Sequence, residues 1–348
     1  MSKTTLPDIV VTNLHRRYTG VSATVKALVP IQQQREAIAV LDSGNLGLPG
    51  TVGFWVIVRN GWSRPKSGQY RIWHARRDVE MLLGLLLKYV LLQRWKLVFT
   101  SAAPKRHRRV LRLIMNRMDA IISTSKRAAG FLDWHTVVVT HGVDTNEFVP
   151  KDKAKAKTEI GFTGKQLIGN FGRIRHSKGT DLLIEALLDV LPDDPDCTAI
   201  ITGEAKESEA QYLLDMQTKI TNAGLSERIV FWGDTPFENI KTLYQACDLC
   251  VAASRVEGFG LTPLEAMASG TAVLTSEAGF WPELIKPGEN GEIFKTDQVA
   301  DLAQKLRQIL LNPETLAQMG KAGRDYVASH HSIQNEVDGI FSVYESLR

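Results

Sequence analysis

The sequence predicts an α/β protein made of two Rossmann-like domains, each with a parallel sheet. Its 348 residues exceed the roughly 250–300 residues at which a single hydrophobic core stops growing. Short runs rich in β-branched residues alternate with helical patterns along the chain, which is typical of parallel strands joined by crossover helices. A content of 44% hydrophobic and 23% charged residues is that of an ordinary globular protein.

The first expected domain, residues 1–155, contains apolar runs of strand length. We expect strands at "DIVVTN", "AIAVL", "FWVIV", "YRIWHA", "KLVFTSA", "AIISTS" and "TVVVTHGV". The most apolar stretch, residues 81–99, is interrupted by charged and polar side chains and falls short of the about 18 apolar residues that a membrane-spanning helix needs. No spanning helix is therefore expected, and the first residues show no secretory signal.

Residues 145–164 are polar and lysine-rich, and we expect them to link the first domain to the second, residues 156–332. The expected strands of the second domain are "QLIGNFG", "CTAIITG", "RIVFWGD", "LCVAAS", "TAVLTS" and "GEIFK". Three cysteines, Cys197, Cys247 and Cys250, are too few for a disulfide framework and suit a reducing cytoplasm. The CxxC pair leads into an apolar strand, so we expect buried thiols rather than a zinc site.

The charge of the chain is distributed unevenly. The formal net charge is +4, but residues 59–127 contain 17 Lys and Arg against 3 Asp and Glu. We therefore expect a strongly positive face on the first domain. A nucleic-acid-binding protein is an alternative that this segment suggests, but no nucleic-acid-binding module is recognisable, so no nucleic-acid partner is expected.

Two cations follow the first strand of the second domain. Arg173 comes directly after "QLIGNFG", and Lys178 lies in the loop that opens an apolar helix. Ligands of open α/β sheets bind beyond the carboxyl ends of the strands, so these cations and the helix N-terminus could hold a diphosphate. They could instead be solvated loop cations. A lysine at a helix start is electrostatically unfavourable, which favours the ligand-binding interpretation.

The stretch "SRVEGFGLTPLEAMASG", residues 254–270, separates two carboxylates by a glycine-containing loop. Glu257 lies in the loop after the strand "LCVAAS", where the glycines would let backbone N–H groups approach a sugar or a phosphate. The segment "TPLE" matches a capping box, with Thr262 as the N-cap residue. That structural role alone would explain Glu265 without a ligand.

These motifs resemble those of glycosyltransferase family 4, retaining enzymes of the GT-B fold. "EGFGLTPLEAMASG" resembles its glutamate-x7-glutamate signature, "GRIRHSKG" its diphosphate-binding motif, "THGVDTNEF" its interdomain stretch and "AGFWPELI" a helix start. The resemblance covers nearly the whole chain. It implies two Rossmann-like domains whose parallel sheets face an interdomain cleft, with the acceptor on the first domain and the donor on the second. It also implies that a C-terminal helix, about 333–348, packs back on the first domain.

The resemblance further implies roles for individual residues. Arg173 and Lys178 would stabilise the leaving diphosphate, Glu257 would contact the donor sugar, and Glu265 would bind the ribose. His74 would lie near the reacting sugar as a catalytic residue, although a packed imidazole at a strand end is an open alternative. The donor site would also include Gly172, Gly258, Phe259, Gly260, Leu261 and Thr262, and the acceptor site Thr19, Gly20, His74, Arg76, Lys105 and Arg106.

A finer resemblance is to the bacterial mannosyltransferases that build the lipopolysaccharide core, carried by "WHARRDVEM", "LVFTSAAPKRH" and "HGVDTNEFVP". It implies transfer of mannose from GDP-mannose to an anionic, Kdo-bearing lipid A acceptor by a cytoplasmic enzyme at the inner membrane surface. A UDP- or ADP-linked donor with a different glycan, and a non-catalytic sugar-nucleotide-binding protein, are the alternatives. We expect no cofactor and no metal, since Arg173 and Lys178 already supply the positive charge.

Overall fold

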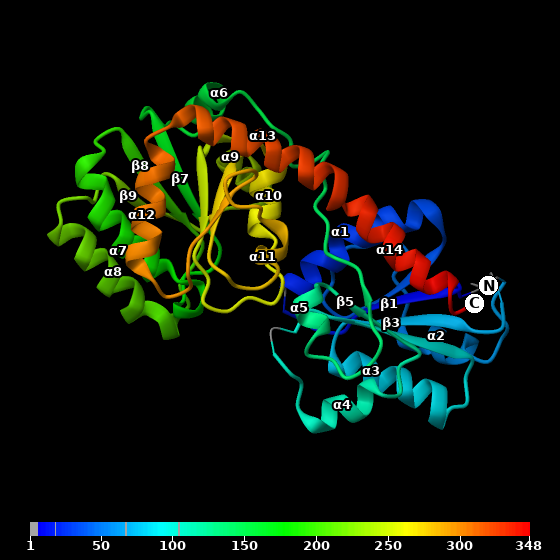
Figure 1. The fold of residues 1–348 in the computed structure, drawn as a ribbon. Coiled ribbons are helices and arrows are strands. Elements are labelled where there is room, and N and C mark those ends of the chain that lie inside the picture. The colour runs from blue at the N-terminus through cyan, green and yellow to red at the C-terminus, as the bar shows by residue number, and fades with distance from the viewer. Residues whose placement is uncertain (1–5, 18, 67, 104) are drawn as a thin grey trace. The chain divides into compact units, whose positions relative to one another are not determined.

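The computed structural model describes residues 6–348 except 18, 67 and 104, and it divides the chain into two compact units. Unit 1 consists of residues 1–141 and 333–348, and unit 2 of residues 142–332. Each unit has its own parallel sheet with helices on both faces (Figure 1). The two parallel sheets predicted from the sequence are thereby confirmed.

The sheet of unit 1 has the strand order β2-β1-β3-β4-β5-β6, with every pairing parallel. Its strands are β1 (Ile9–Asn13), β2 (Ile38–Asp42), β3 (Arg71–Ala75), β4 (Trp95–Ser101), β5 (Ala120–Ser123) and β6 (Val137–Val138). The helices are α1 (Gly20–Arg35), α2 (Phe54–Asn60), α3 (Asp78–Leu85), the π-helix η1 (Leu86–Val90), α4 (Arg109–Met115), α5 (Lys126–Ala129) and the C-terminal α14 (Ile333–Glu345).

Two hydrophobic clusters fill the two faces of this sheet. On one face, α1 and α14 pack beside each other and contribute Val25, Leu28, Val337 and Phe341. On the other face, Ile57 of α2 and Met81 of α3 pack with Trp73 and Trp95. Burial of such side chains is worth about 1.5–3 kcal/mol each, so both faces anchor the sheet whose carboxyl edge carries the candidate residues.

One expected strand of unit 1 is wrong, because "FWVIV" forms the helix α2. The run is continuously apolar, so its periodicity does not separate strand from helix. Only Ile57 of α2 is buried, with Phe54 and Val58 packed against the same core at helical spacing, whereas Trp55 is exposed. The apolar residues 81–99 are divided among α3, η1 and β4. Within the described residues, no helix is long and apolar enough to cross a bilayer.

The sheet of unit 2 has the order β12-β11-β10-β7-β8-β9, again with parallel pairings. Its strands are β7 (Gln166–Phe171), β8 (Cys197–Thr202), β9 (Ile229–Gly233), β10 (Leu249–Ala252), β11 (Ala272–Thr275) and β12 (Glu292–Ile293). The α-helices are α6 (Lys153–Glu159), α7 (Thr180–Val190), α8 (Ala210–Asn222), α9 (Phe237–Ala246), α10 (Thr262–Ala268), α11 (Trp281–Leu284), α12 (Val299–Leu310) and α13 (Pro313–His330).

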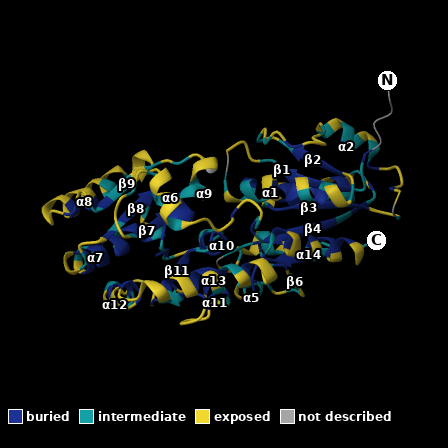
Figure 2. Cartoon of the chain, turned by 90° about the horizontal axis from the view of Figure 1, so that it is seen from above, coloured by how far each residue is buried: buried dark blue, intermediate teal, exposed yellow. Residues whose placement is uncertain are grey.

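Three short 3-10 helices, η2 (His176–Lys178), η3 (Leu191–Asp193) and η4 (Glu207–Glu209), interrupt the loops of unit 2. Separate hydrophobic clusters cover the two faces of its sheet. The strands β7, β8, β10 and β11 are mostly buried, whereas the outward faces of helices such as α8 and α12 are exposed (Figure 2). Cys197, Cys247 and Cys250 are free and buried, as predicted.

The linker expected at residues 145–164 is wrong in its extent, because part of this segment folds into α6 and packs against α9. The ammonium group of Lys153 donates to the carbonyl of Cys247 at 2.5 Å, and Lys157 pairs with Asp248 at 2.7 Å. These lysines therefore have partners inside unit 2. The unit boundary accordingly lies at 141/142 rather than at 155/156.

Candidate functional site

The sheet topology of unit 2 brings two loops together beyond the strand ends. β7 and β10 are neighbours in the sheet. The connection that leaves β7 leads to β8 on one side, and the connection that leaves β10 leads to β11 on the other side. Such a switch point is where open α/β sheets form a crevice for ligands. The loop after β7 carries Gly172, Arg173 and Lys178, and the loop after β10 carries Glu257 and Gly258.

The loop after β7 approaches the end of β10 closely. Gly179 adopts a left-handed φ of 67°, and a Cβ atom there would lie 2.0 Å from the carbonyl oxygen of Ala253. Only glycine permits this combination of backbone angle and contact. Gly172 also has a positive φ, of 129°, and Arg173 beside it is exposed, without an ion pair among the described residues.

Lys178 and Glu257 form an ion pair between the two loops, with 2.5 Å between Nζ and Oε2. Both side chains are largely buried, 23% and 17% exposed. The other oxygen of Glu257 accepts a hydrogen bond from the backbone N–H of Gly258 at 3.2 Å. The structure therefore brings Lys178, the predicted diphosphate-binding residue, into direct contact with Glu257, the predicted sugar-binding residue.

Glu265 does not form the capping box that its sequence context suggested. The N-cap residue of α10 is Leu261, so Thr262 is already helical, and no side chain caps this helix. The carboxylate of Glu265 instead accepts a hydrogen bond of 2.8 Å from the hydroxyl of Tyr244 on α9. Burial raises the pKa of Glu265, and the hydrogen bond from Tyr244 and the charge of Lys178 oppose that rise.

The glycine loop between Glu257 and α10 is held by aromatic side chains. Gly260 has a φ of 87° and its carbonyl accepts a hydrogen bond of 3.0 Å from the Trp281 indole. The ring of Phe259 is buried and stacks on Phe280 with 4.6 Å between centroids. Phe259 can therefore reach a ligand only through its backbone, as the sequence prediction requires. A small recess beside this loop is lined by Gly172, Arg173, Lys178, Ser254, Thr262 and Trp281.

Sequence reasoning missed Arg255, which fastens the two loops. Its guanidinium donates to both oxygens of Asp181 on α7 at 2.7 and 2.8 Å and to the carbonyl of His176 at 2.7 Å. Burial alone would raise the pKa of Asp181, but hydrogen bonds from Arg255 and Tyr212 lower it overall. The available signal was the position of Arg255 directly after the expected strand "LCVAAS", in a loop at the carboxyl edge of the sheet.

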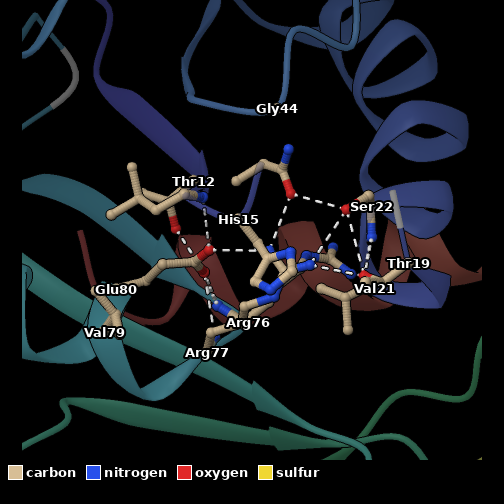
Figure 3. Close-up of polar contacts among 12 residues, drawn as sticks. Thr12, His15, Thr19, Val21, Ser22, Gly44, Arg76, Arg77, Val79 and Glu80 are labelled. Carbon is tan, nitrogen blue, oxygen red and sulfur yellow. Dashed lines mark hydrogen bonds and ion pairs between the residues drawn. The ribbon is translucent and has the colours of Figure 1, made fainter. Parts of the chain in front are cut away.

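The sheet of unit 1 has its own switch point, between β1 and β3. Figure 3 shows how Glu80 of α3 joins the loops that follow these strands. Its fully buried carboxylate accepts hydrogen bonds from the Thr12 hydroxyl at 2.9 Å, the Leu14 N–H at 3.0 Å and the Arg76 N–H at 2.7 Å. No motif or spacing in the sequence singles out Glu80.

Arg77 completes the connection to α1. Its guanidinium contacts Glu80 at 3.3 Å, Asn13 at 2.9 Å and the hydroxyl of Thr19 at 2.8 Å. Thr19 is the N-cap residue of α1, and the helix begins at Gly20. The predicted acceptor residues Thr19, Gly20 and Arg76 thus belong to one cluster at the carboxyl edge, although the side chain of Thr19 is already hydrogen-bonded to Arg77.

The catalytic role expected of His74 disagrees with its environment. The side chain has no exposed surface, and its ring nitrogens are hydrogen-bonded to Thr100 at 2.7 Å and to Tyr344 of α14 at 2.5 Å. Burial, reinforced by the charge of Arg76, holds the pKa of His74 well below its usual value. This geometry matches the packed-imidazole alternative, because neither ring nitrogen is free to meet a sugar.

Lys105 and Arg106 lie apart from the cluster around Arg76. Both are exposed, and Arg106 pairs with Asp133 at 2.6 Å. In the described part of unit 1, no hydrogen bond or ion pair joins either of them to Arg76 or Thr19. Across the described residues, no group of three or more His, Cys, Asp and Glu side chains is arranged to hold a metal ion.

The family model described as glycosyl transferases group 1 matches residues 152–326. The chain is 38% identical over 345 residues to the lipopolysaccharide core biosynthesis mannosyltransferase LpsB of Rhizobium meliloti, covering 98% of this chain and 97% of LpsB. It is equally similar, 38% over 343 residues, to the lipopolysaccharide core biosynthesis mannosyltransferase LpcC of Rhizobium leguminosarum bv. viciae, covering 98% and 96% of the two chains.

Among solved structures, HepE of Anabaena in complex with UDP superposes with a TM-score of 0.81 at 22% identity, covering 97% of this chain and 99% of HepE. That likeness confirms the GT-B fold expected from the sequence. The family match includes the loops that carry Arg173, Lys178, Glu257 and Glu265. The chain therefore belongs to the glycosyl transferases group 1 family.

Proposed function

We propose that the chain transfers mannose from GDP-mannose to a Kdo-bearing, lipid A-linked acceptor of the lipopolysaccharide core, with retention of anomeric configuration. The observation that carries this proposal is the 38% identity, over 98% of the chain, to relatives named as lipopolysaccharide core mannosyltransferases. The switch-point site of unit 2 supports it, because Arg173, Lys178 and Glu257 lie there and would supply the charged groups for the reaction.

The chemistry proposed for unit 2 follows from charge. Negative charge grows on the leaving diphosphate in the transition state, and prearranged cations stabilise such charge most effectively. Arg173, which is exposed and has no ion pair with any described residue, and Lys178 in the same loop would bind the diphosphate. Glu257 would accept hydrogen bonds from sugar hydroxyls, and Glu265 from the ribose. The backbone N–H groups of Gly258, Phe259, Gly260 and Leu261 would line the donor.

For unit 1 we propose attachment to an anionic membrane surface through the face formed by α3, η1 and α4. α3 and α4 pack together (Figure 1). These helices carry large exposed apolar side chains, among them Leu82, Val110 and Leu113, which are 50%, 70% and 71% exposed. Lys105, Arg106, Arg108 and Arg109 are exposed and directly precede Val110 in the chain. Apolar side chains between basic ones are the combination that binds an anionic lipid surface.

A donor screen with two readouts tests the proposed function. Thermal unfolding is followed with GDP-mannose, UDP-glucose and ADP-glucose in EDTA, and release of nucleoside diphosphate is measured with and without acceptor lipid. We expect stabilisation by GDP-mannose above the other two, of about 2.7 kcal/mol at 100 times the dissociation constant, and acceptor-dependent GDP release. Preference for another donor would refute the GDP-mannose assignment, and binding without any release would favour a non-catalytic protein.

A further inference from the structure

Arg76 occupies an unusual position for a charged side chain. It follows β3 directly, at the carboxyl edge between β1 and β3, and only 8% of its surface is exposed. Its Nη1 lies 3.4 Å from the hydroxyl of Thr24, which is a long contact, and its buried Nε has no hydrogen-bond partner. Among the described residues, no carboxylate forms an ion pair with its guanidinium.

The neighbouring Arg77 shows what a satisfied arginine looks like in the same loop. Its guanidinium has Glu80, Asn13, Thr19 and Ser22 as partners (Figure 3). The backbone N–H groups of Arg76 and Arg77 both donate hydrogen bonds to the carboxylate of Glu80. The carboxylate of Glu80 therefore already binds Arg77 and the backbone, and within the described part of the chain the guanidinium of Arg76 has no counter-charge.

An uncompensated buried charge is costly, by several kcal/mol, unless a partner neutralises it. The N-terminus of the 16-residue helix α1 provides a second anion-attracting feature beside Arg76. Thr24 lies one turn beyond Gly20, so the two share a helix face, and a Cβ atom added at Gly20 would meet open space. The N–H groups of Gly20 and Val21 belong to the first turn, where no intrahelical acceptor exists.

We propose that Arg76, together with the first turn of α1, binds an oxyanion of the acceptor, a carboxylate or a phosphate. The guanidinium fork matches either group in a bidentate manner. Arg77 and Glu80 are then positioning residues, because they fix the loop that carries Arg76 against α1. The identity of the ligand as the acceptor rests on the proposed function, whereas binding of an oxyanion at Arg76 does not.

The first test measures thermal unfolding of the full chain, with Arg76→Gln compared with Arg64→Gln, an exposed arginine of the same unit. Inorganic phosphate and free Kdo, whose anion is a carboxylate, are the probes. We expect both to stabilise the wild type and Arg64→Gln but not Arg76→Gln. Without probe, Arg76→Gln should unfold at the wild-type temperature or above, since a buried uncompensated charge is removed. A lower unfolding temperature, or undiminished stabilisation by the probes, would overturn the proposal.

The second test separates this proposal from the proposed function. With lipid acceptor, Arg76→Gln should raise the acceptor KM about tenfold to hundredfold, the scale of one lost charge-assisted hydrogen-bond pair, and leave GDP binding unchanged. Arg76→Lys, which keeps the charge but loses the fork, should lie between the two. A loss of GDP affinity in Arg76→Gln would contradict the acceptor assignment. If the wild type shows no transfer at all, the proposed function fails, and the probe experiment still decides whether Arg76 binds an oxyanion.

Discussion

In the proposed donor site, Lys178 and Glu257 are coupled by an ion pair. Because their ion pair is 2.5 Å long and largely buried, a diphosphate must compete with Glu257 for the lysine. We expect Glu257→Gln to leave GDP affinity unchanged or tighter while transfer falls. Lys178→Gln should weaken GDP binding and lower turnover by roughly tenfold to a thousandfold, as expected for loss of one group that stabilises charge in the transition state.

Calorimetric titration with GDP and a transfer assay measure the two effects separately. Lys219→Gln is the matched control, because Lys219 pairs with Glu185 at 2.7 Å but on the exposed surface of unit 2. It should behave like the wild type in both assays. Full transfer activity in Lys178→Gln would remove the lysine from the proposed mechanism.

We expect His331 to make the stability of unit 2 depend on pH. Burial, with a contribution from neighbouring His330, lowers the pKa of His331 to about 4. Between about pH 6.5 and pH 4 the imidazole of His331 is protonated in the unfolded chain but neutral in the folded chain. The free energy of unfolding therefore declines as the pH falls through that interval. The loss between pH 8 and pH 5 amounts to about 2 kcal/mol.

Urea unfolding at pH 8 and pH 5 measures this loss. His331→Gln should reduce the difference between the two free energies of unfolding, whereas His135→Gln, at an exposed position, should not. Buried His74 has a lowered pKa and acts in the same direction, so some pH dependence should persist. An identical pH dependence in wild type and His331→Gln would show that the imidazole does not titrate as described.

Among the elements, the loop between β7 and α7 depends on the close approach at Gly179. Gly179 and Gly224 have nearly the same left-handed φ, 67° and 69°, but a Cβ atom meets the Ala253 carbonyl oxygen at 2.0 Å in the first case and nothing within 4 Å in the second. A left-handed backbone costs an alanine roughly 1–2 kcal/mol. We expect Gly224→Ala to lose about that much stability, and Gly179→Ala to lose more and to weaken GDP binding as well. Equal unfolding temperatures for the two variants would contradict the close contact.

We predict that the face formed by α3, η1 and α4 binds an anionic membrane surface. Val110 and Leu113 are 70% and 71% exposed, and burial of such side chains in lipid is worth about 1.5–3 kcal/mol each. We expect Val110→Ser with Leu113→Ser to weaken binding to phosphatidylglycerol vesicles at least tenfold without changing donor hydrolysis. Leu311→Ser, at an 84% exposed leucine of unit 2, is the control. Vesicle sedimentation measures the difference, and unaltered binding of the double variant would assign no lipid contact to this face.

Most elements could be predicted because parallel strands buried on both faces appear as short apolar runs. The exceptions have physical causes. The run "FWVIV" is apolar throughout and shows no alternation, so the sequence does not identify the helix α2. The lysine-rich segment of α6 was predicted to be a linker, but its lysine side chains bind carbonyl groups and Asp248 of the same unit. The capping box at "TPLE" was wrong because α10 begins at Leu261 and the hydroxyl of Tyr244, distant in sequence, binds Glu265.

At the scale of the whole molecule, both units place charged side chains at the switch point of a parallel sheet. The sequence identified Arg173, Lys178 and Glu257 through their motifs, but motifs alone do not show that Lys178 and Glu257 are paired or that Arg255 joins their loops. In unit 1 the sequence singled out Arg76 but not Glu80, whose contacts span residues 12–77 and exist only after folding. Pairings between distant segments were the part that sequence could not provide.

The central claim is that this chain adds one mannose to a lipopolysaccharide core acceptor. Mass spectrometry of the Kdo-bearing lipid A acceptor after incubation with GDP-mannose and the full chain in EDTA tests it most directly. We expect the acceptor to gain one hexose with the wild type, more slowly by roughly tenfold to a thousandfold with Lys178→Gln. An acceptor of unchanged mass, with the donor bound and intact, would contradict the claim.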